Sequence, residues 1–114
     1  MVIGPALADR LLGAFAGSDL EALETLTASD VVVFGTDDGE VWHDRASLFD
    51  ALDQMRALGL RAQWRDDLVL GDGWVAGTAD YVLPDGSVLP VRVSLTFVAD
   101  RLVHGHFSVA QPAG

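Results

Sequence analysis

Apolar residues recur at helical spacing near the start of the chain and alternate with polar residues toward its end. In "PALADRLLGAFA", residues 5–16, leucine and phenylalanine side chains return every four positions, and Pro5 suits a first helical turn. In the following "GSDLEALETL", Ser18 precedes Glu21 by three positions, which is a capping-box pattern. The chain is therefore predicted to open with two short amphipathic helices.

A strand pair and a third helix are predicted next. The β-branched run "DVVVFGTD" is typical of a strand, "DDG" at 37–39 is turn chemistry, and "EVW" returns as a short second strand. Asp44 is placed to cap a third helix in "RASLFDALDQMRAL". Gly59 follows that helix, where a residue in the left-handed conformation commonly ends a helix.

The remainder of the chain is predicted to form antiparallel strands. "LRAQWRDDLVL" is expected to be one strand, and "GDG" and "PDG" mark the two turns that follow. Pro90 cannot donate to a strand ladder, so it marks a bulge or the start of a strand. Helices grouped before a run of strands predict an α+β fold, with residues 1–114 as a single domain.

Composition narrows the classes of partner. The chain has 17 acidic and 7 basic residues and a formal net charge of −10, which disfavours nucleic acid and anionic membranes. It has no cysteine and no Gly-rich phosphate loop, so we expect no cofactor. No apolar run approaches the ~20 residues that span a bilayer, and the N-terminus does not resemble a signal peptide, so a cytoplasmic location is expected.

Four segments carry a family resemblance. "AFAGSDLEAL", "FGTDDGEVW", "YVLPDG" and "VHGHFS", in this order, resemble the nuclear transport factor 2-like superfamily, specifically its SnoaL-like branch. The resemblance covers nearly the whole chain. It implies a cone, in which a curved antiparallel sheet wraps around three helices from the N-terminal half and leaves a pocket at the open end. It also implies a homodimer formed through the sheet.

The resemblance does not imply one activity, because the superfamily contains isomerases, epoxide hydrolases, polyketide cyclases and dehydratases as well as members without a known reaction. Its steroid-isomerase-like members place a Tyr–Asp pair in the pocket. The single tyrosine here, Tyr81, lies on a mid-sheet strand, so that pair is not predicted.

His104, His106 and Ser108 are two positions apart on the last strand and therefore share one side of it. We call them the histidine row, and we expect it to face the pocket; the alternative is a polar seam in the dimer interface. An imidazole titrates near neutral pH and suits acid–base catalysis, whereas the competing interpretation is a structural histidine bonded to Ser108 or to the backbone. No acidic residue follows His106, so no metal site is predicted.

Other candidates are a carboxylate, an ion pair and the aromatic side chains. Asp37, at a strand end beside the expected cavity, is a candidate base, and the competing interpretation, which Asp-Asp-Gly turn chemistry favours, is a turn carboxylate that satisfies its own backbone. Asp80 is expected to pair with Arg92 across the sheet. The aromatic residues on the strands suit either an apolar pocket or a sheet-to-sheet interface.

The candidate catalytic residues are His106, His104 and Asp37, and the candidate ligand-binding residues are Trp42, Trp64, Tyr81, Arg92 and Ser108. The expected function is binding of a small apolar or weakly polar molecule in a mostly apolar pocket. One alternative is a cofactor-independent isomerase, cyclase or hydrolase that uses a pocket Asp or His as acid or base. The other alternative is a dimerisation module whose cavity is filled by side chains.

Overall fold

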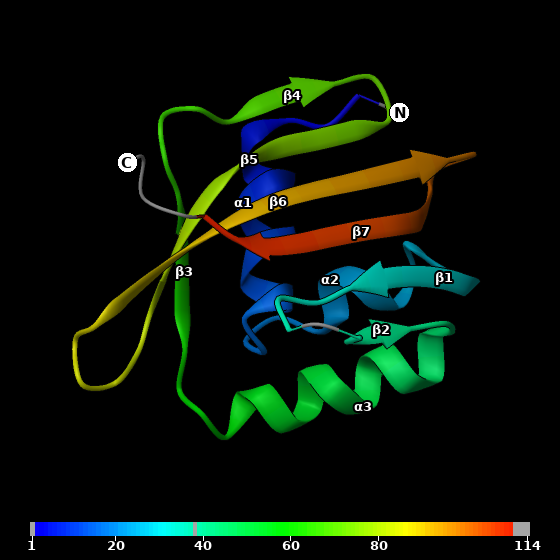
Figure 1. Cartoon of the computed structure of the whole chain (residues 1–114). Coiled ribbons are helices and arrows are strands. Elements are labelled where there is room, and N and C mark those ends of the chain that lie inside the picture. Colours follow the sequence, from blue (N-terminus) through cyan, green and yellow to red (C-terminus); the bar gives the residue numbers. More distant parts are fainter. Residues whose placement is uncertain (1, 38, 111–114) are drawn as a thin grey trace.

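The computed structural model describes residues 2–37 and 39–110, which form an α+β fold (Figure 1). The helices and strands follow one another in the predicted order, except that one expected strand is divided in two. In chain order they are α1 (Pro5–Phe15), α2 (Glu21–Glu24), β1 (Thr27–Phe34), β2 (Val41–Trp42), α3 (Arg45–Arg56), β3 (Arg61–Trp64), β4 (Val69–Gly71), β5 (Trp74–Val82), β6 (Val88–Val98) and β7 (Arg101–Val109).

The strands form one curved, unclosed sheet in the order β2-β1-β7-β6-β5-β3, with β4 also paired to β5. Every pairing is antiparallel except that of β1 with β7, which is parallel. The sheet is therefore mixed: it is antiparallel, as predicted, in every pairing except this one. A hairpin forces its two strands to be antiparallel, but no hairpin joins β1 to β7, and an alternating pattern carries no information on strand direction.

Helix α1 begins with Pro5 at its first turn, as the sequence predicts. It crosses behind the sheet (Figure 1), and its apolar side, which includes Leu11, Leu12 and Phe15, is buried. The indole N–H of Trp64 on β3 donates a hydrogen bond to the Ala8 carbonyl, with an N–O distance of 3.0 Å. This bond joins the far edge of the sheet to α1.

Helix α2 is a single turn without a side-chain cap, so the predicted capping box is wrong. The Ser18 hydroxyl instead donates to the Gly13 carbonyl at the end of α1, at 2.8 Å. Gly17, between the two helices, has φ +88°, and a β-carbon there would lie 2.7 Å from the Arg56 backbone nitrogen. Glycine thus allows the α1–α2 turn to pack directly on the C-terminal end of α3.

Both predicted ends of α3 are confirmed. The Asp44 side chain accepts a hydrogen bond from the Ser47 backbone N–H at 2.7 Å, and this bond lowers the pKa of Asp44 below its usual 3.8. Gly59 follows the helix with φ +65°. Leu48 and Leu52 on α3 are buried against the sheet, so α3 covers the end of the fold formed by β1 and β2 (Figure 1).

The expected long strand after Gly59 is split into β3 and β4 because residues 65–68 leave the sheet. Asp67 in this link accepts hydrogen bonds from the Thr78 hydroxyl at 2.6 Å and from the Thr78 backbone N–H at 2.9 Å. These bonds lower the pKa of the Asp67 carboxyl below its usual 3.8. Leu68 lies over Gly77, where a β-carbon would be only 3.0 Å from the Leu68 α-carbon.

The sheet has an inner face toward the helices and an outer face away from them. On β6 and β7 the inner side chains are buried, among them Val91, Leu95 and Phe107, and they join one hydrophobic cluster with α1 and α3. In the described residues no helix is both long and apolar enough to cross a membrane.

Candidate functional site

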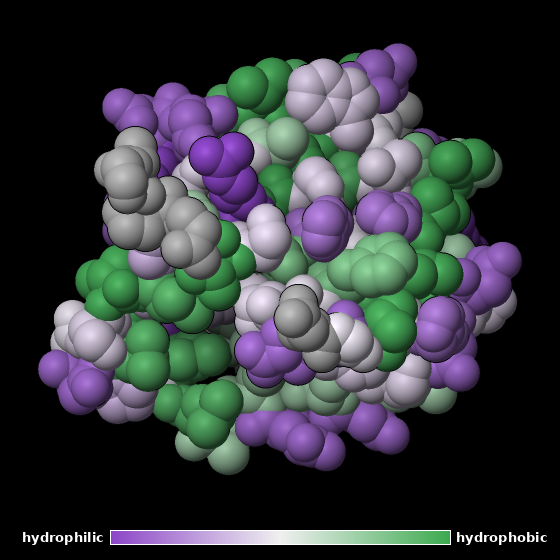
Figure 2. All heavy atoms as spheres, in the orientation of Figure 1, coloured by the Kyte–Doolittle hydropathy of each residue, from purple (hydrophilic) through white to green (hydrophobic). Residues whose placement is uncertain are grey.

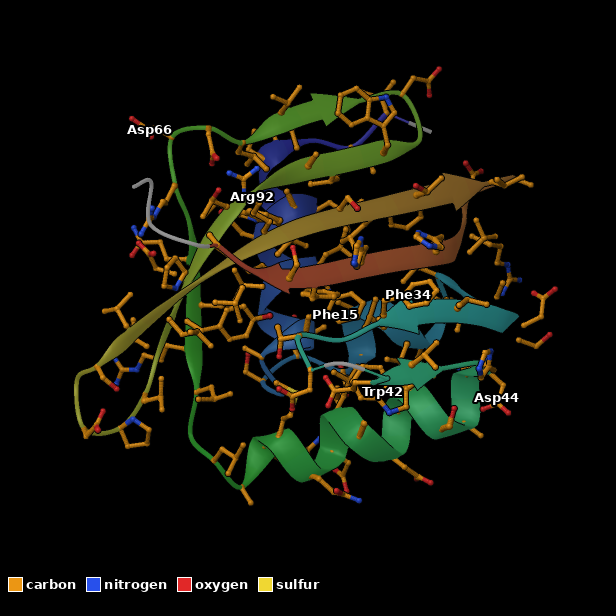
Figure 3. The ribbon with its side chains drawn as sticks, viewed as in Figure 1. Phe15, Phe34, Trp42, Asp44, Asp66 and Arg92 are labelled. Atoms are coloured by element: carbon orange, nitrogen blue, oxygen red, sulfur yellow. The ribbon has the colours of Figure 1, made fainter. Side chains whose placement is uncertain are left out.

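A cavity of about 270 Å³ lies between the inner face of the sheet and α3. Its wall comes from α1, the β1–β2 hairpin, α3 with the residues that follow it, the β5–β6 hairpin and β7. The lining residues are Phe15, Val33, Gly35, Thr36, Glu40, Trp42, Leu48, Leu52, Met55, Leu58, Leu60, Tyr81, Leu83, Leu89, Val91 and Phe107. Figure 3 shows two of them, Phe15 and Trp42, in the region between the sheet and the helices.

Three aromatic side chains form the deep part of the cavity. The rings of Phe15 and Phe107 have their centroids 4.8 Å apart and are tilted by 44°. Tyr81 is buried beside them, and its hydroxyl donates a hydrogen bond to the Phe15 carbonyl at 3.3 Å. Burial raises the pKa of Tyr81 far above its usual 10.0. Tyr81 therefore remains a neutral donor that joins the sheet to the end of α1.

Leucine side chains form the mouth of the cavity. Leu58, which follows α3, is 57% exposed, and Leu83 and Leu89 on the β5–β6 hairpin are also exposed. On the face drawn in Figure 2, hydrophobic side chains gather around a hollow between this hairpin and the C-terminal end of α3. An apolar ligand therefore meets apolar side chains from the mouth of the cavity to its aromatic end.

Within residues 2–37 and 39–110, Glu40 is the one charged residue that lines the cavity. Its backbone carbonyl accepts a hydrogen bond from the N–H of Gly35, the residue that follows β1, at 2.9 Å. This bond places Glu40 opposite Gly35 in the β1–β2 hairpin. Val33 and Gly35 both line the cavity, so the missing side chain of Gly35 is on the cavity side. A β-carbon at Gly35 would overlap the Glu40 carboxylate. The carboxylate thus occupies the space that a side chain at position 35 would fill.

The structure distributes the candidate ligand-binding residues over both faces of the sheet. Trp42 and Tyr81 lie in the cavity wall. Trp64 is also on the inner side, but it packs beneath α1 through its bond to Ala8 and does not line the cavity. Arg92 is on the outer face, exposed and directly opposite Ser108.

The histidine row lies on the outer face, so the prediction that it faces the cavity does not hold. It alternates along β7 with Gly105 and Phe107, which are buried on the inner side. The exposed ring of Phe34 on β1 lies beside both imidazoles, with centroid distances of 5.6 Å to His104 and 5.7 Å to His106. Phe107 takes the inner side because its ring packs on Phe15, which buries more apolar surface than an imidazole can.

The remaining polar candidates also lie outside the cavity wall. Asp37 is an exposed turn residue that does not line the cavity, and its backbone carbonyl accepts a hydrogen bond from the Glu40 N–H at 3.0 Å. Asp80 pairs with Arg65 at 2.7 Å, so its predicted pairing with Arg92 is wrong. The β3–β5 pairing brings Arg65 next to Asp80, whereas Arg92 lies across from Thr78.

Sequence reasoning missed Glu40. Its signal was its place directly after the "DDG" turn, where a hairpin brings it opposite a glycine. Alternation alone does not show that the opposite glycine leaves space for the carboxylate. Within residues 2–37 and 39–110, no three His, Asp or Glu side chains are grouped so that they could hold a metal ion.

The fold and the cavity define the class of protein: a curved sheet wraps around helices, and the sheet and the helices together form an apolar pocket. The family comparison agrees, because the sequence profile of the SnoaL-like domain matches residues 5–112. The chain belongs to this family, the SnoaL-like branch of the nuclear transport factor 2-like superfamily. A comparison with curated proteins found no match.

Solved structures with this fold come from several bacteria. A nuclear transport factor 2-like protein of unknown function from Mesorhizobium loti is 18% identical, with a TM-score of 0.78 over 93% of this chain and 89% of that one. A candidate ketosteroid isomerase from Kribbella flavida is 20% identical, with a TM-score of 0.74 over 96% of this chain and 78% of that one. A protein with a ketosteroid isomerase-like fold from Catenulispora acidiphila, in complex with trimethylamine, is 16% identical, with a TM-score of 0.72 over 92% of this chain and 85% of that one.

Proposed function

We propose that this protein binds a small, largely apolar molecule in the cavity between the sheet and α3. The observation that carries the proposal is the cavity itself, about 270 Å³ of space whose described lining residues are mostly apolar and include one charged residue. Ligand pockets are typically concave, mostly apolar and supplied with a few polar groups that orient the ligand. The relative in complex with trimethylamine supports a small ligand.

The exposed leucines at the mouth support the same function. Leu58, Leu83 and Leu89 keep apolar surface in contact with water at the entrance, and a ligand that covers them removes this surface from water. A module whose interior is filled by side chains needs neither the cavity nor this apolar rim. The cavity therefore favours ligand binding over a purely structural role.

The test uses a variant that fills the cavity. Val91 is buried on the inner face of β6 and lines the cavity, so Val91→Phe places a ring in the empty space. Thr96→Phe adds a ring on the exposed outer face of the same strand and is the matched control. Methyl NMR of the leucine, valine and methionine residues, recorded with cyclohexylmethanol as the neutral probe, reports where the probe binds.

We expect the probe to shift the methyl signals of Leu48, Leu52 and Met55 in the unmodified protein and in Thr96→Phe. Val91→Phe is expected to abolish these shifts while its melting temperature stays unchanged or rises. The proposal is overturned if cyclohexylmethanol and its amine, ketone and acid analogues leave the lining methyl signals unmoved.

A second candidate function is cofactor-independent proton transfer with Glu40 as the base. It is favoured by the position of this carboxylate in an otherwise uncharged wall and by the candidate ketosteroid isomerase among the structural relatives. A base of this kind removes a proton from the carbon next to the carbonyl group of a bound ketone, which leaves an enolate. It then returns to that carbon a proton that has exchanged with solvent. Deuterium incorporation from D2O into cyclohexanone, faster with the protein than with Glu40→Gln, is the expected result; equal rates exclude this function.

A further inference from the structure

The described wall of the cavity carries a negative charge, which binding of an apolar molecule alone does not require. Among the lining residues that the structure describes, Glu40 alone carries a formal charge, and the seven arginine and lysine positions of the chain all lie outside the wall. The cavity side of Gly35 is free of a side chain, which lets the Glu40 carboxylate lie over the backbone there. In the described part of the wall, a ligand therefore meets one negative group and no positive one.

The charge of the whole chain acts in the same direction. Its formal net charge is −10, and a field of this sign raises the local concentration of cations and lowers that of anions. Exposed Asp37 lies three positions before Glu40 in the same hairpin and adds a second carboxylate on that side of the fold. An anionic ligand is disfavoured both in solution near the protein and inside the cavity.

Trp42 adds an aromatic ring to the same wall. Glu40 directly precedes β2 and Trp42 is the last residue of that strand, so the two are two positions apart in the β1–β2 hairpin, and both line the cavity. A carboxylate beside an indole is a favourable environment for an alkylammonium group, because the carboxylate pairs with its charge and the ring face attracts cations. The leucine, methionine and phenylalanine side chains of the wall suit the hydrocarbon part of the same molecule.

We propose that the ligand of this pocket is a small hydrophobic amine, whose ammonium group is held by the Glu40 carboxylate beside Trp42 and whose hydrocarbon part fills the cavity. This inference rests on the proposed binding function, and it adds a charge requirement to it. The cavity volume of about 270 Å³ limits the hydrocarbon part to one ring or a short branched chain.

The experiment compares three probes of equal shape and different charge at pH 7: cyclohexylmethylamine, cyclohexylmethanol and cyclohexanecarboxylate. Affinities are measured by NMR titration of the lining methyl groups at low salt. The variant is Glu40→Gln, which removes the charge and retains the shape. The matched control is Glu21→Gln, which makes the same change on the exposed surface of α2.

We expect the amine to bind about tenfold more tightly than the alcohol, and the carboxylate more weakly than either, since charge-assisted hydrogen bonds are stronger than neutral ones. Glu40→Gln is expected to remove the preference for the amine over the alcohol, and Glu21→Gln to leave the preference intact. Equal affinities for amine and alcohol, or a preference that survives Glu40→Gln, overturn the amine inference and leave apolar binding in place. Failure of all three probes to bind overturns the binding function as well.

Discussion

The Glu40 carboxylate lies over the α-carbon of Gly35, on the cavity side of the β1–β2 hairpin. The two residues face each other in that hairpin, where the Gly35 N–H donates to the Glu40 carbonyl. Because glycine has no side chain, the carboxylate has room beside the apolar wall. The position of the Glu40 charge in the pocket thus depends on a glycine that carries no charge itself.

Gly35→Ala tests this relationship without changing the charge of the chain. The added β-carbon would overlap the end of the flexible Glu40 side chain, so we expect the carboxylate to move and the fold to remain intact. The preference for the amine probe over the alcohol should fall by about the factor seen in Glu40→Gln. Gly4→Ala is the control, because a β-carbon there would meet no atom within 4 Å. An unchanged preference in Gly35→Ala would show that the carboxylate acts from another position.

Tyr81→Phe is expected to lower the free energy of unfolding by about 1 kcal/mol, because it leaves the buried Phe15 carbonyl without its donor. The pKa of Tyr81 is raised in the folded state, so the unfolded chain ionises first as the pH increases. The stability due to the neutral hydroxyl is complete below pH 10 and is lost as the pH rises further. Urea denaturation at pH 7 and at pH 11 measures both effects. Between these pH values, the free energy of unfolding should fall less in Tyr81→Phe than in the unmodified protein.

The single tyrosine of the chain makes this prediction directly visible. Phenolate absorbance should appear together with the loss of circular dichroism during an alkaline titration. Ionisation of Tyr81 while the circular dichroism is still native would contradict the buried, bonded position.

Asp67→Asn is expected to weaken the attachment of the 65–68 link to β5. Hydrogen bonds from Thr78 lower the pKa of Asp67 in the folded state, so the ionised carboxylate stabilises the fold above the unfolded pKa, about 3.9. This stability is lost as the pH falls through the folded-state value. The variant should be less stable than the unmodified protein at pH 7, and the difference should shrink by pH 2.

Denaturant unfolding of Asp67→Asn at a series of pH values measures this difference. The neighbouring Asp66 points away from the sheet (Figure 3), which makes Asp66→Asn the matched control. The stability of Asp67→Asn will still fall in acid, because hydrogen bonds also lower the pKa values of Asp44 and Asp85. A pH-independent difference between Asp67→Asn and the unmodified protein would refute the ionic contribution.

The homodimer expected from the family resemblance remains a prediction, and the outer face of the sheet is where it can be tested. Phe34 is 41% exposed there, between His104 and His106. If two copies pack through this face, Phe34→Asp buries an unpaired charge in the interface and should convert the dimer to a monomer. Sedimentation velocity measures the change, with Val2→Asp as an exposed apolar control. A monomeric unmodified protein would overturn the prediction.

The elements whose signals are local could be predicted from the sequence. Pro5 starts α1, Asp44 caps α3 through a residue three positions away, and Gly59 ends that helix in the left-handed region. In the β5–β6 hairpin, Asp85 accepts the Ser87 N–H two positions on. Each of these contacts lies within a few residues, so the identity of those residues decides it. Ser18 was misassigned because a carbonyl five positions back competes for its hydroxyl.

Only the tertiary structure decided which side of each strand faces the cavity and which charges meet. Alternation divides β7 into a set containing His104 and His106 and a set containing Phe107, but it does not say which set is inside. That choice depends on the apolar surface buried jointly with α1 and the neighbouring strands. The parallel β1–β7 pairing, the Asp80–Arg65 ion pair and the position of Glu40 over Gly35 likewise depend on segments that the fold brings together. Local patterning determines which elements form and which residues share a side, whereas the burial of apolar surface over the whole chain determines how the elements are oriented and where their polar groups lie.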